Sequence, residues 1–169
     1  QAQFNPLQFI AGIAKGLNIY ENTPVLETAP YTARTARGFI KAKRIVVATH
    51  FPFINKHGGY FLKLYQERSY VIALQNAGEV CGMYIDEAKQ GLSFRNYKDL
   101  LLLGGGQHRT GQHRDMLMDC GWRGLESFYR HYYPNAEEVC RWATQDCMTL
   151  DGAPYIGRYA KSTPDLYVI

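Results

Sequence analysis

Hydrophobic positions near the start of the chain recur at the spacing of one helix face. Asn5 is a good helix cap, Pro6 suits the first turn, and Gly16 is a natural stop. The stripe between them consists of Leu7, Ile10, Ala14 and Leu17. The pattern predicts a helix from Asn5 to Gly16.

The segments that follow have the character of strands. Residues 19–27 read as a strand interrupted by Pro24, which indicates an edge or a bulge because proline has no N–H to donate. Residues 31–44 predict a hairpin around Arg37-Gly38. Residues 45–48 form a short, apolar, β-branched run, which is typical of a strand buried on both faces in a parallel sheet.

Closely spaced strands dominate the middle of the chain. After a loop-like stretch at 51–61, the pattern predicts strands at 68–74, 82–86, 92–95 and 100–103. No helix separates them, so we expect an antiparallel meander. A helix at 114–133 follows, and its predicted stripe is Leu117, Gly121, Leu125, Phe128 and Tyr132. Further strands are predicted at 139–145 and 166–169.

These elements predict an α+β fold. We expect residues 52–148 to form a mainly antiparallel sheet with the 114–133 helix on one face. Residues 1–51 and 149–169 are expected to come together as a second layer. Within that layer the runs 45–48 and 166–169 should lie side by side, because both are short and apolar, as neighbouring buried strands are.

Composition narrows the class of protein. The 169 residues are 46% hydrophobic and 20% charged, which is ordinary globular composition. The net charge of +4 is scattered rather than gathered into the basic stripe typical of nucleic-acid-binding proteins; its densest cluster, residues 41–44, is predicted to be a solvated turn. No apolar run approaches the ~20 residues of a membrane helix, and we expect a cytoplasmic protein. The four cysteines show no CxxC spacing, which argues against zinc-ribbon and thioredoxin motifs.

The glycine-rich stretch 104–111 is the first candidate for chemistry. It has neither a GK[ST] sequence nor GxGxxG spacing, so a strand-to-helix turn is the simpler interpretation and the rim of a ligand cleft is the alternative. His108, His113 and Cys120 are poorly spaced for one helix face, and no metal site is predicted.

Tyr84 and Arg95 fall on adjacent predicted strands. A tyrosine hydroxyl and an arginine fork could together hold a polar or anionic substrate. Pairing of Arg95 with Asp86 or Asp99 on the sheet surface is the simpler interpretation of these residues alone.

Two motifs carry a family resemblance. The stretch from Asp146 to Gly157, together with Ile45 to His50 about a hundred residues earlier, resembles the FAD-dependent oxidoreductases of the D-amino-acid oxidase superfamily, such as glycine and sarcosine oxidases. The resemblance rests on the order and spacing of elements and covers nearly the whole chain. It implies hydride transfer from a C–H beside an amine to FAD. The residues implied to contact FAD are Thr49, His50 (where glycine is usual), Asp151, Gly152, Pro154 and Gly157.

This chain departs from the family pattern in two ways. It lacks the N-terminal βαβ unit with GxGxxG that cradles the FAD pyrophosphate, so we expect a fragment that is inactive and retains no FAD. Asp146 stands where amino-acid-oxidising relatives carry an arginine, whereas Tyr84 matches their substrate-facing tyrosine. We therefore expect an amine, or a substrate whose carboxylate lies elsewhere. Alternatively, Asp146 pairs with Arg141 or a backbone N–H, and Arg95 takes the carboxylate.

The resemblance also bears on partners. The stretch from Trp142 to Gly157 resembles a subgroup in which some members carry a Rieske iron–sulfur domain after the flavin region, and such a domain is an expected partner in the whole chain. The competing hypothesis is a self-contained α+β module that binds a ligand or protein without catalysis.

Overall fold

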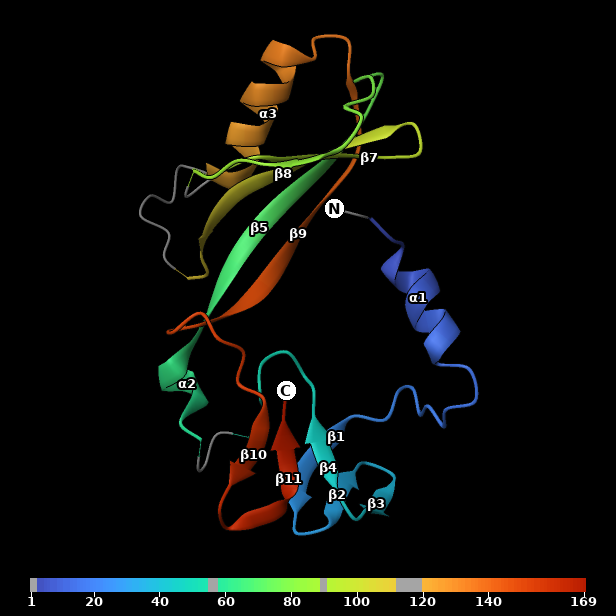
Figure 1. Cartoon of the computed structure of the whole chain (residues 1–169), viewed down its shortest axis with the longest axis vertical. Helices are drawn as coiled ribbons and strands as arrows, with labels where there is room; N and C mark the ends of the chain where they lie inside the picture. The colour runs from blue at the N-terminus through green and yellow to red at the C-terminus, as the bar shows by residue number, and fades with distance from the viewer. Residues whose placement is uncertain (1–2, 55–57, 89–90, 112–119) are drawn as a thin grey trace. The chain divides into compact units, whose positions relative to one another are not determined.

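The computed structural model describes residues 3–54, 58–88, 91–111 and 120–169. The chain forms two compact units (Figure 1). Residues 1–59 and 154–169 make the terminal unit, and residues 60–153 make the central unit. The fold is α+β, with mostly antiparallel sheets and few helices.

The terminal unit begins with helix α1, Pro6–Ile13. The Asn5 side chain accepts hydrogen bonds from the N–H groups of Leu7 and Gln8, at 3.0 and 3.1 Å, so the predicted cap is confirmed. No residue of α1 is buried, and its hydrophobic stripe is exposed, with Leu7 at 77%. The helix is therefore held by local capping and not by a packed face.

Three short strands follow α1: β1 (Val25–Ala29), β2 (Thr32–Thr35) and β3 (Gly38–Lys41), in the order β1-β2-β3. The predicted hairpin is confirmed by the antiparallel pairing of β2 with β3. The predicted strand at 19–27 is wrong before Val25. A turn with Asn22 at a φ of +51° interrupts the chain there, and Pro24 cannot donate to a ladder.

A second small sheet joins segments from the two ends of the chain. Its strands are β4 (Ile45–Val47), β10 (Gly157–Ala160) and β11 (Thr163–Val168), in the order β10-β11-β4. Strands β11 and β4 are parallel, with Leu166 opposite Ile45 and Val168 opposite Val47, so the expected pairing of these runs is confirmed. The expectation that 45–48 is buried on both faces is wrong, because β4 ends the described sheet and Val46 is 55% exposed.

The central unit is built on a five-stranded antiparallel sheet in the order β6-β7-β8-β5-β9. After the short helix α2 (Tyr60–Lys63), its strands are β5 (Leu64–Gln75), β6 (Met83–Ile85), β7 (Ser93–Tyr97), β8 (Leu100–Arg109) and β9 (Glu137–Thr149). The sheet is not a simple meander, because β5 lies between β8 and β9. The glycine-rich stretch is also not the expected strand-to-helix turn. Strand β8 continues through it to Arg109.

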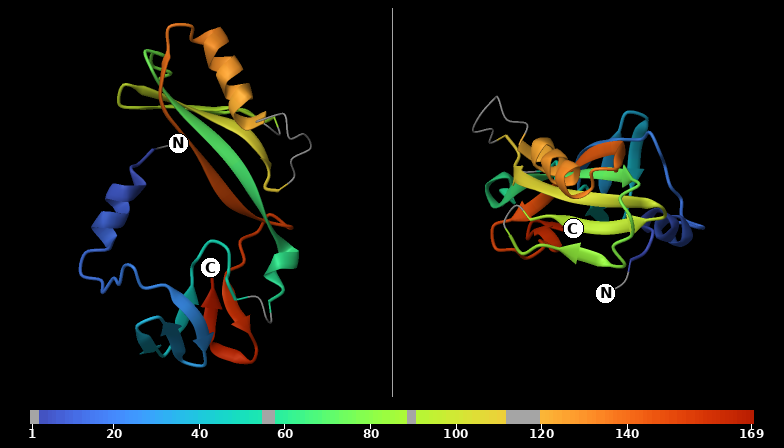
Figure 2. Two further views of the ribbon diagram at one scale, coloured as in Figure 1. Left: turned by 180° about the vertical axis from the view of Figure 1, so that it is seen from behind. Right: turned by 90° about the horizontal axis from the view of Figure 1, so that it is seen from above.

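Helix α3 (Cys120–Tyr132) covers one face of this sheet (Figure 2). The part of the predicted helix at 114–119 lies outside the described residues. Leu125 of the predicted stripe is 1% exposed, whereas Tyr132 is 62% exposed and Tyr129 enters the core in its place. The core between helix and sheet consists of Tyr70, Ile72, Leu74, Leu101, Leu103, Leu125 and Tyr129.

Gly121 allows α3 to pack closely against strands β5 and β8. A Cβ atom at this position would lie 2.1 Å from the ring of Tyr70. Gly106 of β8, at a φ of +67°, meets the same turn of the helix, and its Cβ would lie 2.8 Å from the Gly121 Cα. Glycine is therefore required at the crossing of β8 and α3.

Candidate functional site

The sheet register decides which side chains of the central unit can act together. Tyr84 of β6 lies opposite Phe94, whereas Arg95 lies opposite Met83. Directly paired residues share a face and successive residues alternate, so Tyr84 and Arg95 project from opposite faces. The register therefore does not support the possibility that these two side chains hold one ligand together, and the role of each alone stays a prediction. Neither Asp86 nor Asp99 forms an ion pair with Arg95 in the described structure.

Tyr84 lies on the face that α3 covers. It lines an open aromatic hollow of about 490 Å³. Phe94 and Phe128 meet there with ring centroids 5.5 Å apart, and Phe128 contacts Tyr132 at 4.6 Å. The residues that line this hollow are Val80, Tyr84, Phe94, Phe128, Tyr132 and Tyr133.

The opposite face of the sheet, which we call the α3-distal face, carries a row of three charged residues. Glu67 of β5 lies directly opposite Asp146 of β9 on one side and Arg109 of β8 on the other. The Arg109 guanidinium lies over the Tyr65 ring, 4.9 Å from its centroid. No counter-ion lies within 4.0 Å of Asp146 or Glu67 among the described residues. Two carboxylates placed side by side disfavour each other and favour a cation near them.

Next to this row the same face carries a polar pair and then an indole. The hydroxyls of Ser69 and Thr144 are 3.0 Å apart, and Trp142, two pairs further along, is 39% exposed. Glu67, Arg109 and Tyr65 are candidate substrate-contacting residues that the sequence did not reveal. Their only signal is the register that aligns them with Asp146.

Arg95 shares the α3-distal face with Asp146 but lies far from it. Arg95 aligns with Leu102, Ala73 and Cys140 across the sheet. Cys140 precedes Asp146 by roughly 20 Å of strand, and Arg95 is about 14 Å further across. One ligand group therefore cannot contact both side chains.

The alternative in which Asp146 pairs with Arg141 is wrong. Arg141 lies on the α3 side, where it donates to Glu138 and, at 2.7 Å, to Glu126, and it stacks 4.8 Å from the Trp122 ring centroid. The hydrogen bonds to Glu138 and then Glu126 raise the pKa of Arg141 above its ordinary value, so it stays charged.

In the terminal unit, several predicted cofactor residues gather at one edge of the small sheet. Thr49 and His50 follow the carboxyl end of β4, and Gly157 lies opposite Val168 at the carboxyl end of β11. A Cβ on Gly157 would meet no atom within 4 Å, so the space beside it is open. Ligands of open α/β sheets bind at such carboxyl ends.

The chemistry of this edge fits the polar rim of a flavin ring. An imidazole can hydrogen-bond a ring carbonyl or nitrogen, and the Thr49 hydroxyl, which donates to the Phe51 carbonyl at 3.0 Å, can still accept from a ring N–H. The open side of Gly157 leaves room for a flat group. Pro154 also belongs to the terminal unit, whereas Asp151 and Gly152 belong to the central unit. The Asp151 side chain accepts from the Ala153 N–H at 3.2 Å and shapes the turn at Gly152.

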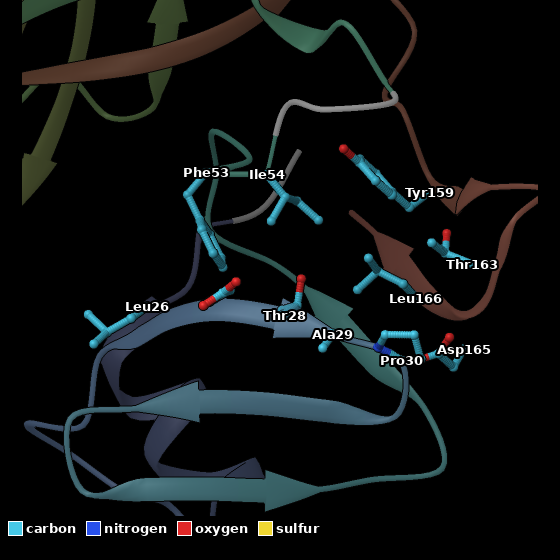
Figure 3. A pocket seen from close by; sticks show the side chains of 11 residues that line it. Leu26, Thr28, Ala29, Pro30, Phe53, Ile54, Tyr159, Thr163, Asp165 and Leu166 are labelled. Atoms are coloured by element: carbon cyan, nitrogen blue, oxygen red, sulfur yellow. The ribbon is translucent and has the colours of Figure 1, made fainter.

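A separate pocket of about 440 Å³ lies within the terminal unit (Figure 3). Its walls come from β1 and β11 and from Phe53 and Ile54. Asp165, at its base, is 4% exposed and accepts the Tyr31 N–H at 2.6 Å. No predicted site residue lines this pocket.

The remaining residues considered for a metal site do not form one in the described structure. His108 hydrogen-bonds the Tyr70 hydroxyl at 2.8 Å, whereas His113 and the side chain of Cys120 lie outside the described residues. In the ranges that the structure describes, no three His, Cys, Asp or Glu side chains are placed to bind a metal ion. None of the described helices is both long and apolar enough to span a bilayer.

Comparison with known proteins finds a family match along the whole chain. Residues 1–169 match the family of FAD dependent oxidoreductases named DAO. A Bacillus subtilis (strain 168) protein, YhfW, which is named as a Rieske 2Fe-2S iron–sulfur protein, is 32% identical over 99% of this chain and 35% of its own length.

Solved structures agree on the fold. Glycine oxidase from Geobacillus kaustophilus superposes with a TM-score of 0.69 at 21% identity, over 94% of this chain and 45% of that enzyme. L-proline dehydrogenase from P. horikoshii superposes with the same TM-score at 20% identity, over 90% of this chain and 45% of that enzyme. The chain thus spans about a third of the curated relative and just under half of the solved ones. The match along all 169 residues shows that the chain belongs to the DAO family of FAD-dependent oxidoreductases.

Proposed function

We propose that the chain supplies the substrate-binding sheet and part of the flavin-binding region of an enzyme that oxidises an amine or amino-acid-like substrate. The observation that carries this proposal is the family match over residues 1–169. The solved relatives are named for glycine, L-proline, iminodiacetate and L-amino acids, all of which bear an amino or imino group.

When bound, FAD would accept the hydride from the carbon beside that nitrogen. In the terminal unit, Thr49, His50, Pro154 and Gly157 are proposed to hold the flavin. For Asp151 and Gly152, which belong to the central unit, the flavin contact that the family resemblance implies stays a prediction. The chain by itself is expected to retain no FAD, since it lacks the GxGxxG turn that binds the pyrophosphate. Stoichiometric FAD co-purifying with these 169 residues alone would contradict that expectation.

The α3-distal face is the proposed substrate surface. Asp146 and Glu67, paired across β9 and β5, would attract an ammonium group and repel a carboxylate at that point. Arg109, on the other side of Glu67, is placed to receive a carboxylate a few ångströms further along. We therefore propose an amine, or an amino acid whose carboxylate is directed away from Asp146.

Anaerobic flavin bleaching of the whole enzyme tests this choice. Glycine, sarcosine, D-amino acids and polyamines would be added in turn to wild type and to Asp146→Asn. We expect the best amine to bleach the variant about 10-fold more slowly. Losing one charge–charge attraction of roughly 1–4 kcal/mol, as for unit charges 4 Å apart, is enough for a change of this size. Asp99→Asn, which neutralises a carboxylate in the turn between β7 and β8, is the matched control. Equal bleaching rates of wild type and Asp146→Asn would show that Asp146 does not influence the choice of substrate.

The wider assembly is also a proposal. The relative YhfW is named as a Rieske protein, and this chain matches about a third of it. We propose that the whole protein carries a Rieske iron–sulfur domain, whose characteristic electron paramagnetic resonance signal in the purified, reduced protein would test the idea.

A further inference from the structure

Arg109 on the α3-distal face has two partners within reach, and it does not pair with the charged one. Glu67 lies directly opposite Arg109 in the pairing of β5 with β8. Among the described residues, no oxygen of Glu67 lies within 4.0 Å of an Arg109 nitrogen. The guanidinium lies instead over the Tyr65 ring, 4.9 Å from its centroid. Arg109 is therefore held away from the carboxylate that directly faces it.

The backbone around Arg109 does not impose this arrangement. The Thr110 N–H donates to the Gln66 carbonyl at 2.8 Å, so the pairing of β8 with β5 continues past Arg109. Directly opposite residues of such a pair have Cβ atoms about 4.5–5.5 Å apart, and diagonal neighbours such as Tyr65 lie about 7–8 Å away. A side chain as long as arginine reaches either partner, so the side chains themselves decide between them.

The Tyr65 ring supplies the attraction that favours the diagonal partner. Arg109 is exposed, whereas Tyr65 and Glu67 are half-buried. A guanidinium stacks well on an aromatic face, and at an exposed site this contact is comparable in strength with an ion pair. If residue 65 were aliphatic, the Glu67 carboxylate would be the partner that remains.

The position of Arg109 decides what the charged row can bind. With the guanidinium on Tyr65, the carboxylates of Glu67 and Asp146, paired across β5 and β9, act together on a cation. The guanidinium then keeps its N–H donors for a separate anionic group. With the guanidinium on Glu67, the two charges would neutralise each other, and Asp146 alone would attract a cation.

We propose that Tyr65 is a positioning residue: its ring holds Arg109 away from Glu67 and so keeps the negative and positive ends of the row separate. The inference rests on the proposed function, under which the α3-distal face binds an amine. It adds the device that leaves the Glu67 and Asp146 carboxylates available to the ammonium group of the substrate.

Arginine labelling of the whole protein by phenylglyoxal measures the state of Arg109 without any substrate. The reagent attacks the neutral guanidine, and a carboxylate partner lowers that fraction because it favours the charged form. Peptide mapping gives the rate at each arginine. Arg95, which forms no ion pair in the described structure, provides the rate of a free side chain. Arg141, which pairs with Glu126 and Glu138, provides the rate of a paired one.

Three variants separate the ring from the carboxylate. In wild type and in Tyr65→Phe, which keeps an aromatic face, Arg109 should react at about the rate of Arg95. In Tyr65→Leu it should react about 2- to 5-fold more slowly, because Glu67 becomes its partner. Combining Tyr65→Leu with Glu67→Gln should restore the faster rate, since a neutral amide forms no ion pair.

Steady-state oxidation of sarcosine and putrescine by the same proteins tests the consequence for substrate binding. Tyr65→Leu should raise KM by about 2- to 5-fold and leave kcat unchanged, since the lost attraction acts equally on the bound substrate and the transition state. In a Glu67→Gln background Tyr65→Leu should add nothing to KM. A general loss of packing would lower kcat or persist in that background.

Two labelling results would overturn the inference and leave the proposed function intact. One is an Arg109 rate that Tyr65→Leu does not change. The other is a slower rate that persists after Glu67→Gln is added. Slower labelling with an unchanged KM for both amines would overturn the link between Tyr65 and substrate binding. If the whole wild-type protein oxidised no amine, the proposed function would fail, whereas the labelling rates would still identify the partner of Arg109.

Discussion

Gly121 shows how much one hydrogen atom in place of a methyl group can matter. A methyl group at this position would lie 2.1 Å from the Tyr70 ring, whereas one at Gly124, a turn away on the same helix, would meet nothing within 4 Å. We expect Gly121→Ala to lower the free energy of unfolding by about 1–3 kcal/mol through overpacking. Gly124→Ala should raise it by up to about 1 kcal/mol through helix propensity. Urea unfolding of both variants is the measurement, and equal effects would contradict the close approach of α3.

Cysteine reactivity gives a second prediction at the same scale. Burial raises the pKa of the Cys147 thiol, whereas Cys81 and Cys140 are exposed. The thiolate is the reactive form, so near pH 8 Cys147 should be alkylated more slowly than the other two, and its rate should keep rising at higher pH. Peptide mapping after timed iodoacetamide labelling measures each site separately. Labelling of Cys147 as fast as that of Cys140 would contradict the prediction.

The sequence can point to a single candidate residue, but it does not show which residues lie beside it in the sheet. The family resemblance singled out Asp146 as the position at which amino-acid-oxidising relatives carry an arginine. Its neighbours Glu67 and Arg109 could not be singled out, because a shift of one residue in strand register moves every side chain to the other face. For the same reason the sequence could not show that Tyr84 and Arg95 project from opposite faces of the sheet.

At the scale of elements, Arg141 fastens α3 to β9. It connects Glu126 and Trp122 of the helix with Glu138 of the strand. We expect Arg141→Ala to lower the free energy of unfolding by about 1 kcal/mol, because each ion pair or cation–π contact at such an exposed site contributes little to stability. The loss should shrink in 1 M NaCl, which screens the charges. Arg123→Ala, on the same helix without an ion pair in the described structure, should cost close to nothing in the same unfolding experiment.

Local chemistry made some elements predictable and left others hidden. The capped helix α1 and the β2–β3 hairpin carry strong local signals in Asn5-Pro6 and Arg37-Gly38. The extension of β8 through 104–109 carries the opposite signal, because glycines weaken strands. Tertiary context decides there, because β5 pairs with β8 on both sides of a bulge at residues 106–107, and α3 needs the small residues.

At the scale of the whole molecule, the central unit has a hydrophobic core of its own. All residues of the core around Ile72 and Leu125 fall within 60–153. We expect residues 60–153 expressed alone to fold and to melt cooperatively, as followed by near-ultraviolet circular dichroism. A non-cooperative melt would show that this core is not sufficient. The same isolated piece with Ile72→Ala serves as the control for native packing. Its free energy of unfolding should fall by about 2–5 kcal/mol.

The pairing of β4 with β11 could be predicted because both runs are short and apolar, although they lie far apart in sequence. The sequence shows the division of the chain into units approximately. The loop-like stretch 51–61 and the Asp151-Gly152 turn lie near the two ends of 60–153, and the exact boundaries follow from contacts between the strands.

The parallel pair also has a consequence in time. On the ribosome, Leu166 emerges 121 positions after its partner Ile45, which at 5–20 residues per second is a delay of roughly 6–24 s. Throughout that interval the apolar edge of β4 is without this partner and open to pairing with other nascent chains. The three cations Lys41, Lys43 and Arg44, directly before β4, stand where charged gatekeepers limit such aggregation.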